Sequence, residues 1–188
     1  MKKTIIAIIA VALVAALGVG SYFLFTPNKD SGEVTVAIEE FADNPDILIS
    51  LMTNPARFES IVENDYQLGA EKTAEFYECP EEWLTYSELI TVKNTTEDTI
   101  AVYGLEITDN GKNGVYISTV LDAEYEIVPD SNASVYFNIL CDNGDLTTYE
   151  AKALVDSMDI KVVYRDASVS EDAASTDYKT AAVNQITE

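Results

Sequence analysis

Residues 134–141 read Ser-Val-Tyr-Phe-Asn-Ile-Leu-Cys, and apolar side chains recur there at every second position. A period of two places alternate residues on opposite faces of a strand. One face carries Val135, Phe137, Ile139 and Cys141, and the other carries Ser134, Tyr136, Asn138 and Leu140. Residues 159–165 repeat the pattern, with Ile160, Val162 and Tyr164 in phase. Two such strands predict a β domain in which one face of the sheet is buried.

On either side of these two strands, further short segments have strand-like alternation, and turn residues separate them. The runs alternate with stretches rich in Asn, Asp and Gly, which favour tight turns. Some seven short strands at regular spacing predict a mainly β fold, a β-sandwich. The predicted strands are 72–78, 85–93, 99–108, 115–120, 123–128, 134–141 and 159–165. We also expect a helix at 146–158, before the last strand, and a bulge or a close backbone contact at Gly104.

The segment before the sandwich contains two helix-start signals, Asn44-Pro45 and Asn54-Pro55. Asn is a favoured N-cap residue, and Pro suits the first helical position. They predict short helices at 45–52 and 55–63, whereas 33–41 fits strand and helix equally well. We therefore divide the exported part into a short helical segment, 33–68, and a β-sandwich domain, 69–166. The helices either cap the sandwich or form a partner-binding groove.

The N-terminal residues 1–26 predict a membrane anchor. Ile5–Phe25 carries no charge and is long enough to cross a bilayer as a helix. Lys2 and Lys3 precede this run, so the positive-inside rule places the rest of the chain outside the cytoplasm, after a linker at 27–32. A cleaved signal peptide is the alternative. We expect a single-pass protein of the cell membrane with an extracellular C-terminal domain and a disordered tail at 167–188.

The charge and the composition exclude several classes of function. The net charge is −22, from 33 acidic and 11 basic side chains, so nucleic acid is not an expected partner. The sequence has no histidine, which removes the commonest catalytic base and transition-metal ligand. The turn that starts at Asp109 has Gly111 and Val120 where a calcium loop needs ligands. We expect no enzyme activity, no cofactor and no metal.

Four stretches carry a resemblance to a known group of proteins. They are Leu89–Thr96, Ile100–Gly104, Val128–Ser131 and Ile160–Tyr164. In their strand and turn pattern they resemble exported immunoglobulin-like domains of Gram-positive bacteria, over roughly Phe76 to Arg165. The resemblance implies an immunoglobulin-like β-sandwich at the cell surface. It transfers no catalytic residue, and many members of the group have no assigned function.

Cys79 and Cys141 are the only cysteines. An even number of cysteines on the exported side predicts a disulfide between them, and two buried, reduced thiols are the alternative.

Aromatic residues are the candidate ligand surface, because exposed aromatic side chains supply contact area at low entropic cost. The candidates are Trp83, Tyr103, Tyr116 and Tyr136. The expected function is a membrane-anchored extracellular module that binds a protein or glycan of the cell envelope or acts as a spacer. The alternatives are a hydrolase that uses carboxylates and an accessory subunit of an envelope complex.

Overall fold

The computed structural model describes residues 32–168 and 178–184, and these residues form a mainly β structure. This confirms the predicted fold class at the level of secondary structure. The predicted anchor, Ile5–Phe25, lies outside the described residues. In the two described ranges, no helix combines the length and the apolar character that crossing a bilayer requires.

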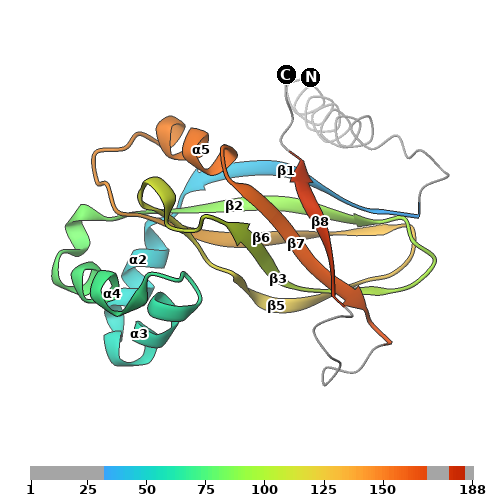
Figure 1. The fold of residues 1–188 in the computed structure, drawn as a ribbon, viewed down its shortest axis with the longest axis horizontal. Helices are drawn as coiled ribbons and strands as arrows, with labels where there is room; N and C mark the ends of the chain where they lie inside the picture. Colours follow the sequence, from blue (N-terminus) through green and yellow to red (C-terminus); the bar gives the residue numbers. More distant parts are fainter. Residues whose placement is uncertain (1–31, 169–177, 185–188) are drawn as a thin grey trace, which may run out of the picture. The chain divides into compact units, whose positions relative to one another are not determined.

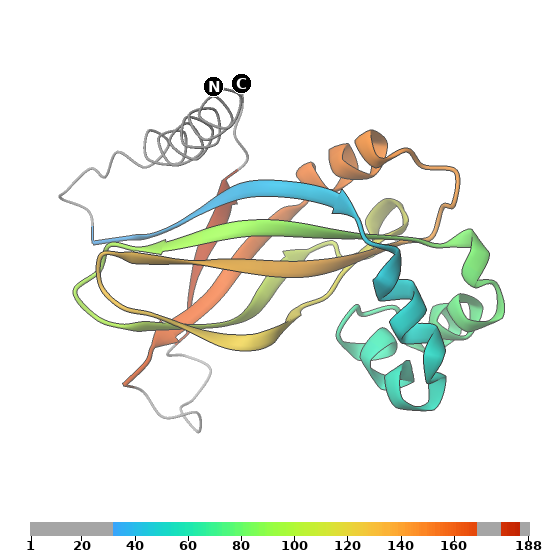
Figure 2. The ribbon, with the colours of Figure 1, turned by 180° about the vertical axis from the view of Figure 1, so that it is seen from behind.

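Eight strands within the described ranges form one curled sheet in the order β4-β6-β2-β1-β8-β7-β3-β5 (Figures 1 and 2). The strands are β1 (Val34–Asp43), β2 (Leu84–Asn94), β3 (Ile100–Thr108), β4 (Val115–Ile117), β5 (Val120–Ile127), β6 (Ser131–Cys141), β7 (Asp159–Asp166) and β8 (Lys179–Asn184). All neighbours are antiparallel except β1 and β8, which are parallel. The ambiguous segment at 33–41 is therefore a strand.

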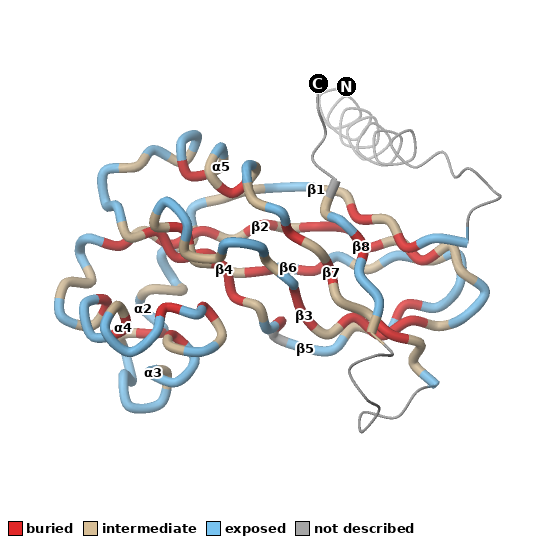
Figure 3. The backbone as a smooth tube through the Cα atoms, viewed as in Figure 1, coloured by how far each residue is buried: buried red, intermediate tan, exposed pale blue. Residues whose placement is uncertain are grey.

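The main core lies inside the curl of this sheet. On β6, the face that the alternation predicted to be buried is buried, from Val135 to Cys141. β2 pairs with β6 along its whole length and contributes Ile90 and Val92, while β7 contributes Val162 from the other half of the sheet. Figure 3 shows that the buried positions concentrate on the strands. Side chains from both halves thus share one core.

Gly104 interrupts β3, as the sequence predicted. The pairing of β3 with both β5 and β7 shifts in register between Val102 and Gly104. A Cβ atom at this position would overlap the carbonyl oxygen of Thr119. Only glycine allows the backbone of β3 to lie this close to the connection between β4 and β5.

The predicted disordered tail is wrong for residues 179–184. This segment forms β8, which pairs with β7 and, over two residue pairs, with β1. Ala181 is buried and Val183 packs against the main core, so small apolar side chains suffice to order a strand between two others. The strand joins the two halves of the sheet, which a local reading of the sequence does not indicate.

Three helices pack at one end of the sheet. They are α2 (Pro45–Thr53), α3 (Pro55–Asn64) and α4 (Gly69–Glu78). The two Asn-Pro signals correctly predicted α2 and α3, although neither Asn side chain caps its helix. The helices share a second apolar cluster with Trp83 and with Leu140, which lies on the outer face of β6.

The strand predicted at 72–78 is wrong, because this segment is α4. Thr73 and Phe76 are its buried residues, which is the three-residue spacing of one helix face. Lys72 also pairs with Glu75 at 2.8 Å across a single turn. The helical layer therefore extends past the predicted boundary at residue 69, and the sheet begins before it, at Val34.

The helix expected before the last predicted strand is confirmed as α5 (Thr148–Asp156). Thr147 is its N-cap and forms a capping box with Glu150, in which each side chain bonds to the other residue's backbone N–H. Ala151 and Val155 are buried in the main core, and α5 packs against β1 and β4 (Figure 1). The helix covers one end of the curled sheet.

Candidate binding groove

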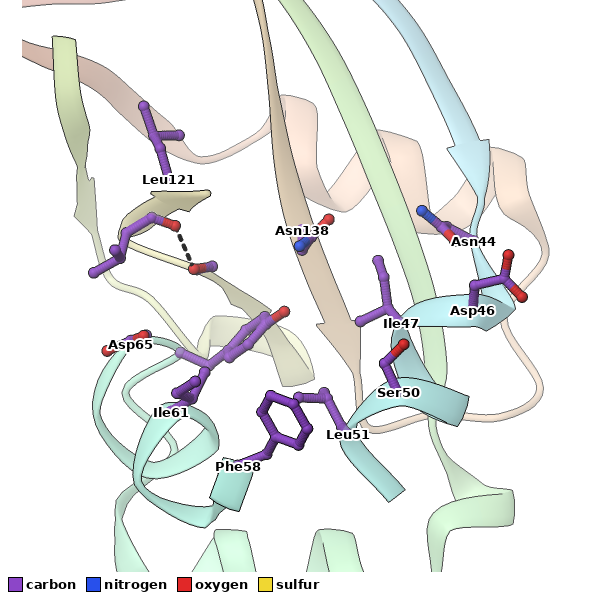
Figure 4. Close-up of a pocket in the computed structure, with 13 residues that line it drawn as sticks. Asn44, Asp46, Ile47, Ser50, Leu51, Phe58, Ile61, Asp65, Leu121 and Asn138 are labelled. Carbon is purple, nitrogen blue, oxygen red and sulfur yellow. Dashed lines mark hydrogen bonds between the residues drawn. The ribbon is translucent and has the colours of Figure 1, made fainter. Parts of the chain in front are cut away.

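A groove of about 520 Å³ lies where α2 and α3 meet the outer face of the sheet. Figure 4 shows side chains from both helices facing β6 and the start of β5 across it. The lining residues are Asn44, Asp46, Ile47, Ser50, Leu51, Phe58, Ile61, Asp65, Tyr66, Ser118, Val120, Leu121 and Asn138. These residues come from four separate parts of the chain, so the groove exists only in the folded domain.

The first wall of the groove is α2, which is held to β2 by hydrogen bonds at its start. The Asn44 backbone N–H donates to the Thr85 carbonyl at 2.9 Å, and the Thr85 hydroxyl donates to the Asn44 carbonyl at 2.7 Å. The Asn44 side chain reaches the Ser87 hydroxyl at 3.3 Å. These bonds orient the helix so that Ile47 and Leu51 line the groove.

The second wall is the end of α3, which is held to the connection between β4 and β5. The Thr119 backbone N–H and hydroxyl both donate to the Asp65 carbonyl, at 2.8 and 3.0 Å. Asn110 donates to the Tyr66 carbonyl and exchanges two hydrogen bonds with the Ile117 backbone. The turn at 109–114, which resembles a calcium loop in sequence, thus contributes a structural Asn.

The polar groups of the groove are acidic or neutral. Burial and the neighbouring Asp65 carboxylate raise the pKa of Tyr66, an effect that the Asn138 side chain opposes, so the phenol stays protonated. Partial burial also raises the pKa of Asp65. Asp46 supplies a second carboxylate, and no Lys or Arg is among the lining residues. In Figure 4, Asp46 and Asp65 lie on opposite sides of the groove.

Apolar side chains at the rim are open to solvent. Val120 is 52% exposed and Ile61 is 36% exposed. Phe58 lies between the two helices beside Leu51 (Figure 4). A concave surface with apolar walls and a few polar groups is the usual form of a ligand site.

The structure does not bring the four predicted aromatic residues together. Trp83 is 3% exposed and packs against Phe76 in the helical cluster, so it is a core residue. Tyr116 lies 5.9 Å from Trp83, measured between ring centroids. Tyr103 stacks with the Arg165 guanidinium at 4.4 Å on the other half of the sheet. Tyr136 is 53% exposed on the outer face of β6, two residues from Asn138 of the groove.

The predicted disulfide between Cys79 and Cys141 is wrong, since both cysteines are free thiols. Cys141 points into the main core, as its phase on β6 predicted, and burial raises its pKa to about 12. Cys79 follows the last turn of α4 in the helical layer. The alternation on β6 correctly predicted that the Cys141 sulfur points inward. A disulfide also needs the second cysteine close by, but Cys79 lies at the end of α4 in the helical layer.

A second, polar cavity lies beside the groove's helical layer. It measures about 320 Å³ and is lined by Glu81, Glu82, Asp142, Asn143, Gly144 and Asp145. Lys72 forms an ion pair with Asp142 at 3.0 Å at its edge. Within the described ranges, no three acidic or cysteine side chains are grouped closely enough to hold a metal ion.

Glu88 is an ionisable residue inside the main core. It lies on β2 between Phe41 of β1 and Phe137 of β6, and it is 1% exposed. Neither carboxylate oxygen has a hydrogen-bond partner in the described structure. Burial raises its pKa to about 7, an effect that nearby Lys152 of α5 opposes. Glu88 lies within the predicted strand 85–93, but the sequence gave no sign of its isolation.

Sequence reasoning found only part of the groove. The Asn-Pro signals located α2 and α3, and a partner-binding groove was one of the two roles considered for these helices. Asp65, Tyr66 and Asn138 were missed. Tyr66 and Asn138 are far apart in sequence and belong to a helix end and a strand, so only the tertiary fold brings them together.

No family model and no curated protein matches this chain. Among solved structures, a protein from Archaeoglobus fulgidus is similar at 13% identity and a TM-score of 0.31, over 53% of this chain and 78% of that one. A FixG-related protein from Vibrio parahaemolyticus is similar at 16% identity and a TM-score of 0.26, over 53% of this chain and 73% of that one. Likenesses this distant carry no argument about function.

Proposed function

We propose that this chain is an exported, membrane-anchored binding module that holds its ligand in the groove between α2, α3 and the sheet. The observation that carries the proposal is the groove itself, with apolar walls and with Ile61 and Val120 open to solvent. The predicted anchor at Ile5–Phe25 and the two lysines before it support a place at the cell envelope. The resemblance to exported immunoglobulin-like domains is part of the same proposal.

The charge of the groove indicates what kind of ligand it selects. Asp46 and Asp65 line it without a Lys or Arg among the lining residues, and the chain as a whole carries −22. A field of this sign attracts cations and repels anions. The ligand we propose is therefore cationic and partly apolar, such as a basic segment of an envelope protein.

Binding is a better account of the groove than hydrolysis by carboxylates. A glycosidase needs two carboxylates that flank one bond at a defined separation. Asp46 and Asp65 do lie on opposite sides of the groove (Figure 4), but the walls between them are largely apolar and open to solvent at Ile61 and Val120, which suits a partly apolar ligand better than a sugar. An accessory subunit that docks a partner protein would use the groove in the way we propose.

Site-specific photo-cross-linking tests the proposal. A photoreactive amino acid replaces Val120 at the groove rim or, as the matched control, Tyr149, which is 83% exposed on α5. In intact cells, we expect adducts of defined mass at position 120 and none at position 149. The double variant Asp46→Asn, Asp65→Asn should reduce the adducts because it removes both carboxylates. Equal labelling at the two positions would contradict a ligand site in this groove.

A further inference from the structure

The groove has one strongly negative end, at the C-terminal end of α3. Phe58, Ile61 and Asp65 all line the groove, and their spacing of three and four residues places them on one face of the helix. Asp65 still has helical backbone angles, so its side chain continues this face. In Figure 4, Ile61 and Asp65 lie beside each other at the end of α3. The groove face of α3 therefore ends in a carboxylate.

Several features concentrate negative potential at Asp65. The C-terminal end of a helix carries a partial negative charge, which adds to that of the carboxylate. α3 has no basic residue in its last turn. Among residues 32–168 and 178–184, no lysine or arginine forms an ion pair with Asp65. Partial burial raises the pKa of Asp65, because its charge has lost part of its hydration. A cation that binds here would offset both the charge and the lost hydration.

Asp46, the other carboxylate of the groove, has different surroundings. It is exposed in the first turn of α2, where the positive end of the helix dipole already stabilises its charge. Asp65 is also held more firmly, since its backbone carbonyl accepts two hydrogen bonds from Thr119. We therefore expect Asp65, rather than Asp46, to bind the charged group of a ligand.

The opposite end of the same helix face is unsuited to a cation. The Arg57 guanidinium lies 5.2 Å from the centroid of the Phe58 ring. Arg57 and Asp65 are eight residues apart in sequence, which corresponds to about 12 Å along a helix. Ile61 lies between them, and Val120 lines the groove from the sheet side. A ligand thus meets a positive charge at one end, apolar side chains in the middle and a negative charge at the other end.

We infer that the groove binds a lysine side chain of a partner protein, with the ammonium group at Asp65 and the alkyl stem against Ile61 and Val120. This inference rests on the proposed function and specifies its ligand. Lysine carries a compact charge on a flexible stem of about four carbons. Residues one helical turn apart are separated by about 5–6 Å between Cβ atoms, a distance that such a stem can span. A second copy of this chain, with a net charge of −22, would be repelled.

The test uses the full-length chain in detergent micelles and follows the methyl resonances of Ile61 and Val120 by NMR. The probe is the peptide acetyl-Leu-Lys-Leu-amide. Its matched control contains Nε-acetyllysine, which keeps the alkyl stem and removes the charge. A third peptide has Glu in place of Lys.

Three protein variants separate Asp65 from the general field of the chain. Asp65→Asn removes the partner of the ammonium group and keeps the backbone carbonyl that Thr119 holds. Asp46→Asn removes the other carboxylate of the groove. Glu63→Gln removes a charge from the last turn of α3 that does not line the groove.

We expect the lysine peptide to shift both methyl resonances, and the two control peptides to bind at least roughly tenfold more weakly. Asp65→Asn should weaken binding of the lysine peptide by roughly tenfold, because a hydrogen bond between two charged groups is lost. Asp46→Asn and Glu63→Gln should each change the affinity by less than about threefold, because exposed charges act through a field that salt screens.

Three results would overturn the inference. They are equal binding of the Nε-acetylated peptide, equal weakening by Asp65→Asn and Asp46→Asn, and a lysine peptide that leaves both methyl resonances unshifted. In each case the proposed function stands if adducts still form at position 120 in cells, since the groove would then hold its ligand through another group. Loss of those adducts contradicts the proposed function instead.

Discussion

Replacing Glu88 with Gln should stabilise the protein at neutral and alkaline pH. The Glu88 carboxylate is buried between Phe41 and Phe137, and neither oxygen accepts a hydrogen bond within the described structure. Lys152 lowers the cost of its charge, but Asp156, which is ion-paired to Lys152 at 2.7 Å, raises it. A buried charge without a bonded partner destabilises the folded state. Gln has nearly the same shape and carries no charge.

The pH window follows from the direction of the pKa change. Burial raises the pKa of Glu88 from 4.5 to about 7, so at pH below 4.5 the group is protonated in both the folded and the unfolded chain and costs nothing. Between these values only the unfolded chain ionises, and the free energy of unfolding falls as the pH rises. Above pH 7 the loss is complete. The difference corresponds to roughly 3 kcal/mol.

Urea unfolding of the wild type and Glu88→Gln at pH 5 and pH 8 measures this effect. Trp83 is the single tryptophan and is buried, so its fluorescence follows unfolding. Removing any one of 33 acidic charges relieves some repulsion. Glu97→Gln, in an exposed turn, controls for that general effect. We expect Glu88→Gln to gain about 2–3 kcal/mol at pH 8 and much less at pH 5, relative to this control.

The reasoning would be refuted if Glu88→Gln and Glu97→Gln changed the unfolding free energy equally at both pH values. That result would mean that the Glu88 carboxylate is solvated or paired with Lys152 in solution. A loss of stability at pH 8 would have the same meaning, because it would show that the charged form makes favourable contacts.

Three further predictions concern the fold. Phe76→Ala should lower the free energy of unfolding by about 3–5 kcal/mol in a single transition, because this buried ring joins the helices to the sheet through one cluster; separate transitions of helices and strands would contradict it. Ala181→Asp should destabilise by roughly 2–4 kcal/mol and Ala182→Asp by much less in thermal melts, because Ala181 is buried on β8 and Ala182 is exposed; equal effects would show that β8 is not paired. Without reductant, a thiol reagent should label both Cys79 and Cys141 in the unfolded protein but Cys79 much faster than Cys141 in the native one; a disulfide in mass spectra would contradict this.

The sequence by itself determined the local structure of most elements. Alternation on 134–141 identified β6 and its buried face, because side chains on a strand alternate whatever the strand pairs with. The Asn-Pro pairs located α2 and α3, because proline restricts the backbone of the residue before it as well as its own. Gly104 was correctly predicted as an irregular point in β3. The first two features depend on interactions within a few residues, whereas glycine at position 104 leaves room for the Thr119 carbonyl of another segment.

Predictions from local sequence patterns were wrong where one pattern is compatible with two different structures. Residues 72–78 alternate enough to suggest a strand, yet Thr73 and Phe76 also lie on one helical face, and packing against Trp83 selected the helix. Residues 179–184 lack large apolar side chains and suggested disorder. The gap between β1 and β7 accepts just such small residues, which orders β8.

Only the tertiary structure determined the candidate site. The groove joins Asn44 and Tyr66 of the helical layer to Val120 and Asn138 of the sheet. Hydrogen bonds across long stretches of sequence, such as that from Thr119 to Asp65, hold the walls of the groove in place. Composition already argued against nucleic acid as a partner, since a net charge of −22 is a property of the sequence. Where a ligand meets apolar walls depends on which helices pack against the sheet, because a strand's own residues do not specify its neighbours.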